Sequence, residues 1–225
     1  MAGTLHVVAT PIGNLEDITY RAVRVLKEAD RILAEDTRHT GKLLAHLGIQ
    51  GRMVSVHGHN EKGRLDQILG WLEAGESLAL VSDAGTPAIS DPGAALVTAA
   101  REAGYRVSPV PGACAFVAAA CAAGLPTDKL SFIGFLPGRP GRRRKLLETV
   151  VHNGGTTALY VSPHRVVKDL GIAAEVAGAD RPACLCRELT KVYEEFDRGT
   201  LGELEARWSS KTPKGEMVLL IGPPE

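Results

Sequence analysis

Short apolar runs alternate with segments of helical periodicity through the first half of the chain. The apolar runs, each of a length typical of a buried strand, cover residues 5–9, 31–34, 53–56, 77–81 and 105–110. Amphipathic segments separate them, at residues 18–29, 40–47, 64–74 and 94–103. Strand–helix–strand units form right-handed crossovers, so this pattern predicts an α/β domain with a mostly parallel sheet.

The second half has a different pattern. Apolar runs at residues 131–135, 156–161, 183–187 and 217–221 lie further apart, and helical segments cover residues 142–153 and 166–177. Between the halves, residues 113–123 are nearly all small and apolar, as in a tightly packed helix between domains. We therefore expect two α/β domains, residues 1–113 and 114–225, the second with a mixed sheet.

Composition excludes several classes of protein. The chain has 225 residues, of which 26 are Lys or Arg and 26 are Asp or Glu, so any contact with nucleic acid must use a local patch. Its apolar runs are too short to cross a membrane, and the N-terminus lacks the features of a signal peptide. Four cysteines without metal-ligand spacing indicate free thiols in a cytoplasmic protein, with no metal site.

The segment after the fourth predicted strand, VSDAGTPAISDPG at residues 81–93, is the most informative in the chain. Its glycines allow a ligand to approach the backbone, its prolines stiffen the loop, and Asp83 and Asp91 can accept hydrogen bonds. Loops at the carboxyl ends of parallel strands are where open α/β sheets bind ligands. The alternative is an ordinary connection in which Asp91 caps the next helix.

Four other polar loops should meet this segment at the same edge of the sheet. They are residues 10–14, 35–40, 57–61 and 111–113. Together they offer carboxylate, guanidinium, imidazole and amide groups, which suit polar chemistry on a small molecule. Each also has a structural interpretation: Glu35 and Asp36 could pair with Arg38 near a helix start, and His57 could be an ordinary loop histidine.

One dense basic run is present, at residues 138–145. Cations at a helix N-terminus oppose the helix dipole, and a cluster placed there is easier to explain if it meets phosphates. A solvated helix start is the alternative. The candidate RNA-binding residues are Arg139, Arg142, Arg143, Arg144 and Lys145.

Seven segments in order resemble a known family. They read ATPIGNLEDIT, AEDTRHT, VSDAGTPAISDPG, AAGLPTDKLSFIGFLP, SPHR, CRELTKVYEE and KGEMVLLIG. The set is similar to the bacterial small-subunit ribosomal RNA cytidine-2′-O-methyltransferases of type I, in the tetrapyrrole methylase superfamily. The resemblance covers residues 4–222, and the long loop together with RELTK is its most specific part.

The resemblance implies two α/β domains with S-adenosyl-L-methionine in the cleft between them, within a homodimer. It implies methyl transfer to the ribose 2′-hydroxyl of a cytidine in the decoding region of 16S rRNA. We expect the 30S subunit to be the substrate, and naked 16S rRNA is the alternative that the sequence leaves open. Carried over by motif, the cofactor contacts would be Ile12, Asp83, Ala84, Gly85, Thr86, Pro87, Ile89, Gly112, Ala113, Cys114, Ala115, Tyr160 and Gly215.

Such a reaction needs alignment of the ribose oxygen with the methyl group, and a base or a cation that assists the hydroxyl. The sequence offers proton acceptors and cations without choosing among them: Asp36, Glu35, His57, Arg38, Arg187 and Lys191. No metal is required.

The chain departs from the family pattern at two positions. Val161 stands where the family usually has Glu, which removes a carboxylate expected near the cofactor, and Ala113 stands where Pro is common. Two other functions remain open. One is a tetrapyrrole-type methyltransferase that acts on a small molecule, and the other is a non-catalytic RNA- or ribosome-binding module.

Overall fold

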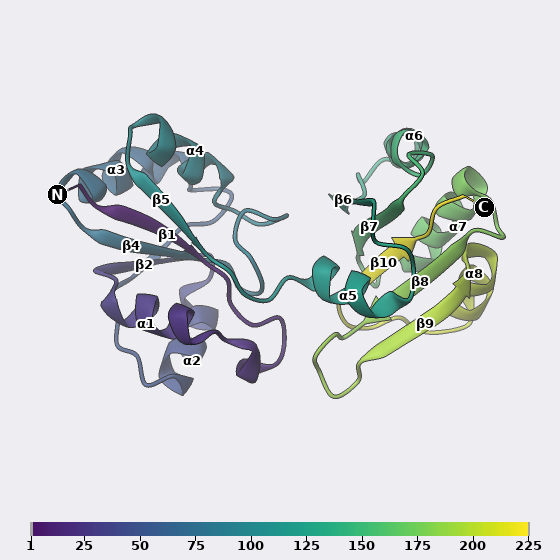
Figure 1. Ribbon diagram of the computed structural model, residues 1–225, viewed down its shortest axis with the longest axis horizontal. Helices are drawn as coiled ribbons and strands as arrows, with labels where there is room; N and C mark the ends of the chain where they lie inside the picture. The colour runs from purple at the N-terminus through teal and green to yellow at the C-terminus, as the bar shows by residue number, and fades with distance from the viewer. Residues whose placement is uncertain (1, 225) are drawn as a thin grey trace. The chain divides into compact units, whose positions relative to one another are not determined.

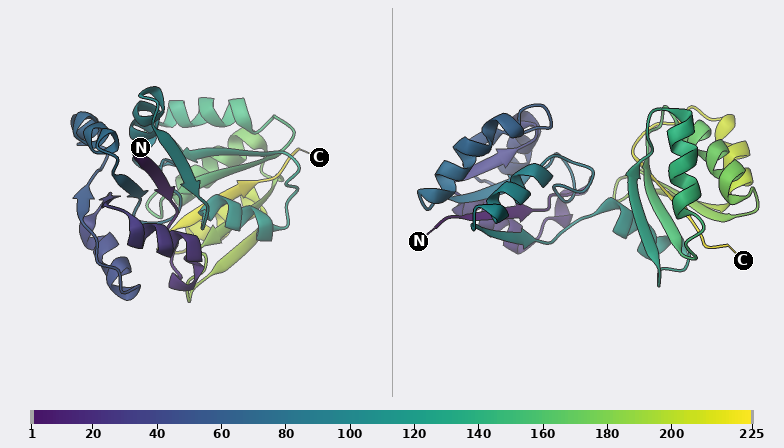
Figure 2. Two further views of the ribbon diagram at one scale, coloured as in Figure 1. Left: turned by 60° about the vertical axis from the view of Figure 1, so that its left-hand side comes forward. Right: turned by 90° about the horizontal axis from the view of Figure 1, so that it is seen from above.

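The computed structural model describes residues 2–224, which form two compact units, one up to Cys114 and one from Ala115 onward. Figure 1 shows both units as α/β layers, and Figure 2 gives two further views. Among residues 2–224 we find no helix with the length and apolar character that spanning a membrane requires.

The first unit has a five-stranded sheet of order β3-β2-β4-β1-β5, in which every pairing is parallel. This confirms the parallel sheet predicted from the alternating pattern. The strands are β1 (Thr4–Val8), β2 (Arg31–Ala34), β3 (Met53–Ser55), β4 (Ser77–Val81) and β5 (Arg106–Val110), with helices α1 (Tyr20–Glu28), α2 (Thr37–His46), α3 (Leu65–Glu73) and α4 (Ala94–Glu102) and short 3-10 turns at Leu15–Asp17 and Lys62–Arg64.

Helices cover both faces of this sheet (Figure 1). Alternate residues of the strands pack with α1 and α2 on one face and with α3 and α4 on the other, so that Leu33 and Ala34 belong to different clusters. Side-chain caps fix two helix starts: Thr19 accepts from Ala22 N, and Asp36 accepts from Arg38 N. The second helix therefore begins at Thr37, three residues before the predicted start.

The second unit has a mixed sheet of order β6-β7-β10-β8-β9, as predicted. Only β6 and β7 pair in parallel, and the other pairings are antiparallel. The elements are α5 (Ala115–Ala123), β6 (Leu130–Phe135), α6 (Pro140–Val150), β7 (Thr156–Val161), α7 (Val166–Ala177), β8 (Pro182–Arg187), β9 (Glu195–Thr200), α8 (Leu201–Ser209) and β10 (Met217–Ile221).

Strand β9 and helix α8 are not among the predicted elements. The strand reads EFDRGT and lacks an apolar run, because it lies at the edge of the sheet and forms a hairpin with β8. The start of α8 does carry a sequence signal. Thr200 and Glu203 form a capping box, in which each side chain accepts a hydrogen bond from the other residue's backbone amide.

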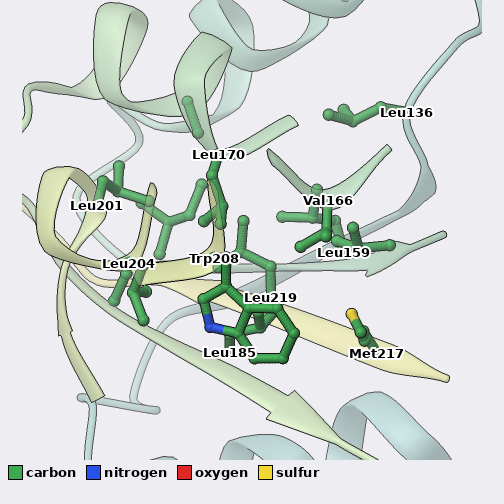
Figure 3. Packing of buried hydrophobic residues seen from close by; sticks show 14 of the residues in the cluster. Leu136, Leu159, Val166, Leu170, Leu185, Leu201, Leu204, Trp208, Met217 and Leu219 are labelled. Atoms are coloured by element: carbon green, nitrogen blue, oxygen red, sulfur yellow. The ribbon is translucent and has the colours of Figure 1, made fainter. Parts of the chain in front are cut away.

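The core of the second unit lies between the sheet and helices α6, α7 and α8, while α5 contacts the sheet through β10, β7 and β8. Figure 3 shows Trp208 in the middle of this core. The indole of Trp208 is almost fully buried, and its Nε1 donates to Oδ2 of Asp197 at 2.8 Å. The polar strand β9 thus satisfies the one polar atom of the largest core side chain.

Candidate functional site

The loops after β1 and β4 are joined by a backbone bridge. Thr10 N donates to Gly85 O at 2.9 Å, and Gly85 N donates to Thr10 O at 3.1 Å. The buried hydroxyl of Thr10 also donates to Ser82 O at 3.3 Å. These bonds fix the first half of the long loop against the segment that contains Ile12.

The loop after β5 joins the same edge of the sheet. Oγ1 of Thr86 donates to Ala113 O at 3.1 Å. Gly85 has a φ of +78°, and a Cβ atom at this position would lie 3.3 Å from Cγ2 of Ile12 and 3.7 Å from Ala113 O. A side chain there would therefore be strained and would fill the space beside Ile12. The structure brings Ile12, Gly85, Thr86 and Ala113 together, as predicted.

Carboxylates gather where β2 and β4 end. Oδ1 of Asp83 accepts from Asp36 N at 3.1 Å, which links these two loops. Burial and the nearby charge of Asp83 raise the pKa of Glu35. Burial, together with the charge of Glu35, raises the pKa of Asp91 to about 6. This edge of the sheet therefore has a negative potential, which favours a positively charged ligand.

Asp91 does not cap the following helix, so that interpretation of the long loop was wrong. The N-cap of α4 is Gly93, which makes no side-chain cap. Instead Oε1 of Glu61, a buried residue from the loop after β3, accepts from Leu96 N at 2.9 Å. Ala88 and Ser90 have φ values of 67° and 66°. Non-glycine residues in this region are strained, and such strain gathers at ligand-binding loops.

Asp36 and Arg38 have a structural role, as the alternative interpretation held. Asp36 caps α2, and its Oδ2 lies 2.8 Å from Nη2 of Arg38. The guanidinium holds the pKa of Asp36 far below its usual range. So weak a base takes up a proton poorly at neutral pH, which argues against Asp36 as the proton acceptor. Arg38, whose side chain is 88% exposed, stays a candidate cation for a ribose or phosphate oxygen.

His57 lies in a loop ordered by its neighbours. The backbone amide of His57 donates to Oδ1 of Asn60 at 2.8 Å, and Nδ1 of its ring accepts from His59 N at 3.3 Å. The Nε2 atom has no hydrogen bond among those found in residues 2–224. His57 also exerts a coulombic effect on Glu35, which places the two side chains in one electrostatic environment.

In the second unit, the loop after β8 holds an ammonium group between two carboxylates. Nζ of Lys191 lies 2.9 Å from Oε1 of Glu188 and 2.7 Å from Oε2 of Glu216. Burial opposes the charged form of Lys191, but hydrogen bonds to Glu216 and Glu188 outweigh it and raise the pKa of the amine. Lys191 is therefore a fixed cation and does not act as a base at neutral pH.

The position of the Glu188 side chain requires glycine at residue 215. A Cβ atom at this residue would lie 2.6 Å from Cγ and Cδ of Glu188, and its φ is +87°. Glu216 N also donates to Oε1 of Glu188 at 2.9 Å. Glu188 is not among the predicted site residues, although it lies within the RELTK segment. Arg187 pairs with Glu195 through its Nε, at 3.0 Å from Oε2.

Tyr160 lies on the face of the mixed sheet that α5 covers. Its ring centroid is 4.9 Å from that of Phe132, which stacks on Phe116 of α5 at 4.2 Å. The neighbouring Val161 points to the opposite face and is buried in the core. An apolar residue at position 161 therefore fits its surroundings, on the face of the sheet opposite to Tyr160.

The basic run forms the first turns of α6, and its members differ in exposure. Arg143 is buried: Nη1 lies 3.1 Å from Oδ1 of Asp169, and Nε and Nη2 donate to the carbonyls of Pro137 and Gly138. It is therefore not available to RNA, which corrects its predicted role. Arg144 is exposed but pairs with Glu175. The remaining predicted RNA-binding residues are exposed: Arg139, Arg142 and Lys145.

Comparison with known proteins identifies the family of this chain. Residues 4–205 match the profile of the tetrapyrrole (corrin/porphyrin) methylases. The chain belongs to the tetrapyrrole methylase family. Among its relatives, ribosomal RNA small subunit methyltransferase I of Halalkalibacterium halodurans is 51% identical over 97% of this chain and 75% of the relative. The protein of the same name from Synechocystis is 49% identical over 97% of this chain and 78% of the relative.

Solved structures show the same fold at low identity. Uroporphyrin-III C-methyltransferase of Thermus thermophilus has a TM-score of 0.70 and 20% identity, over 98% of this chain and 97% of that one. A cobalt precorrin-4 methyltransferase also gives a TM-score of 0.70, at 21% identity over 98% and 94% of the two chains. These structures confirm the predicted two-domain α/β fold of the tetrapyrrole methylases.

A tetrapyrrole methylase requires a methyl donor, and the first unit fits one that carries positive charge. Gly85 leaves room beside Ile12, the backbone bridge to Thr10 fixes the loop, and the carboxylates of Glu35, Asp83 and Asp91 supply negative charge. The other predicted contacts in this unit lie on the same loops: Ala84, Pro87, Ile89, Gly112 and Cys114. Ala115, by contrast, is the first residue of α5.

Proposed function

We propose that this tetrapyrrole methylase transfers the methyl group of S-adenosyl-L-methionine to the ribose 2′-hydroxyl of a cytidine in the decoding region of 16S rRNA. One observation carries the proposal. Relatives named ribosomal RNA small subunit methyltransferase I are 45–51% identical over 97–99% of the chain. Three solved structures of tetrapyrrole methyltransferases are only 20–22% identical to this chain, although they share its fold.

The proposed donor site in the first unit is built from the loops joined by Thr10 and Gly85. The sulfonium donor supplies an electrophilic methyl group and its own leaving group. Ile12 would contact its apolar part, and Asp83 would accept hydrogen bonds from its polar atoms. The raised pKa values of Glu35 and Asp91 fit a site where a bound cation relieves repulsion between carboxylates. Tyr160 and Gly215 remain proposed contacts by family resemblance.

The carboxylates and cations described above include the candidate groups that would assist the ribose hydroxyl. Glu35 and His57 are the better proton acceptors, because Arg38 lowers the pKa of Asp36 and makes its carboxylate a weak base. In the second unit we propose Arg187 and Lys191 as cations for a ribose or phosphate oxygen. Lys191 would act through its charge, since its pKa is raised.

The proposed RNA contacts are the exposed cations at the start of α6, namely Arg139, Arg142 and Lys145. Arg144 is a further candidate, although its guanidinium pairs with Glu175. Charge there would bind phosphates without reading sequence. We further propose that the substrate is the 30S subunit and that the enzyme acts as a homodimer, as the family resemblance implies for the dimer. A location in the cytoplasm is proposed from its four free thiols.

Ribose-methylation mapping of 16S rRNA tests this proposal. A strain without the gene should lose one 2′-O-methylcytidine in the decoding region, and a plasmid copy of the gene should restore it. Unchanged rRNA methylation in the deletion strain, together with methylation of a tetrapyrrole by the purified enzyme, would favour the small-molecule function instead. RNA binding without any methyl transfer would favour the non-catalytic module.

A further inference from the structure

Helix α2 exposes basic side chains and no acidic ones. It reads TRHTGKLLAH, and at 3.6 residues per turn its four basic side chains lie within an arc of about 100°. They are all exposed, and we call them the basic face of α2: Arg38, His39, Lys42 and His46. Thr40 and Leu44 lie on the opposite side of the helix and are buried.

The charge of the basic face is not balanced by its neighbours. Arg38 forms an ion pair with Asp36, just before the helix. The other three side chains of the face have no ion pair or hydrogen bond within residues 2–224. On α1, by contrast, Nη1 of Arg24 lies 2.8 Å from Oε2 of Glu28, one turn later. A carboxylate three or four residues away stabilises an exposed cation in this way, and α2 has none.

Helix α1 extends the positive surface within the same layer. Both helices pack on one face of the parallel sheet, α1 through Leu26 and α2 through Leu44. Two more cations of α1, Arg21 and Lys27, are exposed and have no ion pair in the part of the chain that the structure describes. With three Lys or Arg residues on α1 and two on α2, the layer has one acidic helix residue, Glu28.

The helices of the opposite layer carry mostly the other sign. Figure 1 shows α3 and α4 across the sheet from α1 and α2, and their charged residues are Asp66, Glu73, Arg101 and Glu102. The 3-10 turns before α1 and α3 partly offset these charges, with Glu16 and Asp17 in the first and Lys62 and Arg64 in the second. Because the chain has 26 cationic and 26 anionic residues, the positive surface is a local feature, and it is least diluted on α2.

The basic face begins beside the candidate donor site. Asp36 caps α2, and its backbone amide donates to Oδ1 of Asp83 at 3.1 Å. From Arg38 the face follows the helix axis to His46, over about 12 Å at a rise of 1.5 Å per residue. A chain molecule bound along α2 would therefore have one end near the loop that contains Asp83.

A polyanionic chain fits this surface better than a membrane or a protein does. The apolar side of α2 packs in the core, so the helix has no apolar side left to insert into a bilayer. The exposed arc has no apolar side chain larger than that of Ala45, whereas protein interfaces centre on large buried anchors. Cations alone suffice to bind a phosphate backbone, through their charge and the release of counterions.

We propose that the basic face of α2 binds the phosphate backbone of the substrate RNA, and that Arg21 and Lys27 of α1 extend this contact. The inference rests on the proposed function, because it takes RNA as the substrate. It adds an RNA surface on the first unit to the cations proposed on α6. Phosphate contacts carry no sequence information, so this surface sets the path of the RNA strand relative to the donor loops.

The test uses the full-length protein and fluorescently labelled 16S rRNA transcribed in vitro. Lys42→Gln should weaken rRNA binding roughly tenfold at about 0.1 M salt and lower the salt slope by about one, because one phosphate contact is lost. Lys42→Glu should weaken the binding further. Lys, Gln and Glu have similar helix propensities, so both variants should keep the unfolding midpoint of the wild type.

Arg101→Gln is the matched control, because it removes one exposed cation from α4 in the opposite layer. It should leave the rRNA affinity and the salt slope unchanged, and an effect as large as that of Lys42→Gln would overturn the proposal. Calorimetry should show the same affinity for S-adenosyl-L-methionine in wild type and Lys42→Gln. Unchanged rRNA affinity and slope in both Lys42 variants would also overturn the proposal.

Binding to 30S subunits separates RNA contacts from protein contacts. Both Lys42 variants should bind the subunit more weakly as well. A loss confined to the subunit, with naked rRNA bound as tightly as by the wild type, would assign the basic face to a ribosomal protein and contradict the proposal. Should the variants weaken rRNA binding as expected while the wild type transfers no methyl group to rRNA or to subunits, only the proposed function would fail.

Discussion

In the second unit, Nη1 of Arg143 lies 3.1 Å from Oδ1 of Asp169, and the two side chains are 7% and 2% exposed. Burial raises the pKa of Asp169, although the charge of Arg143 opposes that shift. The remaining donors of Arg143 bind the carbonyls of Pro137 and Gly138. The guanidinium therefore fastens the turn between β6 and α6 to helix α7.

Removal of this guanidinium should lower the stability of the protein without a direct effect on its affinity for RNA. Arg143→Ala leaves Asp169 buried without its partner, which costs about 3–5 kcal/mol in comparable pairs. Denaturant unfolding checks the prediction. Asp169→Ala should lose a similar amount, and an unchanged midpoint in both variants would contradict the account of the buried pair.

Replacement of the neighbouring exposed cation, Arg142, should change RNA binding and leave stability unchanged. Arg142→Ala should keep the stability of the wild type and weaken RNA binding, with a salt dependence reduced by about one unit of slope. Titrations at several salt concentrations measure this slope. Arg101→Ala, on α4 in the first unit, is the control for loss of an exposed arginine. Equal slopes for wild type and Arg142→Ala would remove Arg142 from the RNA surface.

Much of this fold was predictable because its strands are apolar and its helices amphipathic. The parallel sheet and the meeting of loops at Thr10 and Gly85 follow from that alternation. Strand β9 was not predicted because it is joined to the core by a hydrogen bond from Trp208 to Asp197, and hydrophobic periodicity does not reveal such a polar contact. The RNA-binding role of Arg143 was mistaken, and the sequence left Asp36 between a base and an ion-pair partner of Arg38, because sequence does not show which charges are buried or paired.

The donor loop gives a prediction about Gly85. Gly85→Ala should destabilise the protein by about 1–2 kcal/mol, because its φ of +78° lies in the left-handed region, and should weaken donor binding by about tenfold or more. Calorimetry with S-adenosyl-L-methionine measures the affinity. Gly48→Ala is a close control: its φ is +63°, but nothing lies within 4 Å of the added Cβ. Gly48→Ala should lose a similar amount of stability and keep the donor affinity of the wild type.

Asp91 should make stability depend on pH. Its pKa is about 6 in the folded chain against an ordinary 3.8, so the folded state holds the extra proton between these values. Stability contributed by this group therefore falls as pH rises from about 4 to above 6. Asp91→Asn should be more stable than the wild type at pH 8, by about 1 kcal/mol after allowance for partial exposure, and nearly equal at pH 4. Unfolding curves at both pH values decide this, and a gain of the same size at pH 4 would contradict it.

Glu188 should position Lys191 and sustain its charge. Glu188→Ala removes one of the carboxylates that raise the pKa of this amine, so the alkaline limb of the pH–rate profile should move to lower pH. It should also cost about 1–2 kcal/mol of stability, because Glu216 N loses its acceptor. Glu188→Gln retains an acceptor oxygen and should keep most of the stability while still shifting the profile. A profile identical to that of the wild type in both variants would show that Lys191 has no part in the reaction.

The central claim is that the loops held by Thr10 and Gly85 serve a donor whose methyl group goes to 16S rRNA. The most direct measurement uses purified enzyme, radiolabelled S-adenosyl-L-methionine and 30S subunits from a strain without this methylation. We predict label in one cytidine ribose of the decoding region, and a large loss of label with Asp83→Ala. Absence of label in 16S rRNA from the wild-type enzyme, or full transfer by the Asp83 variant, would contradict the account.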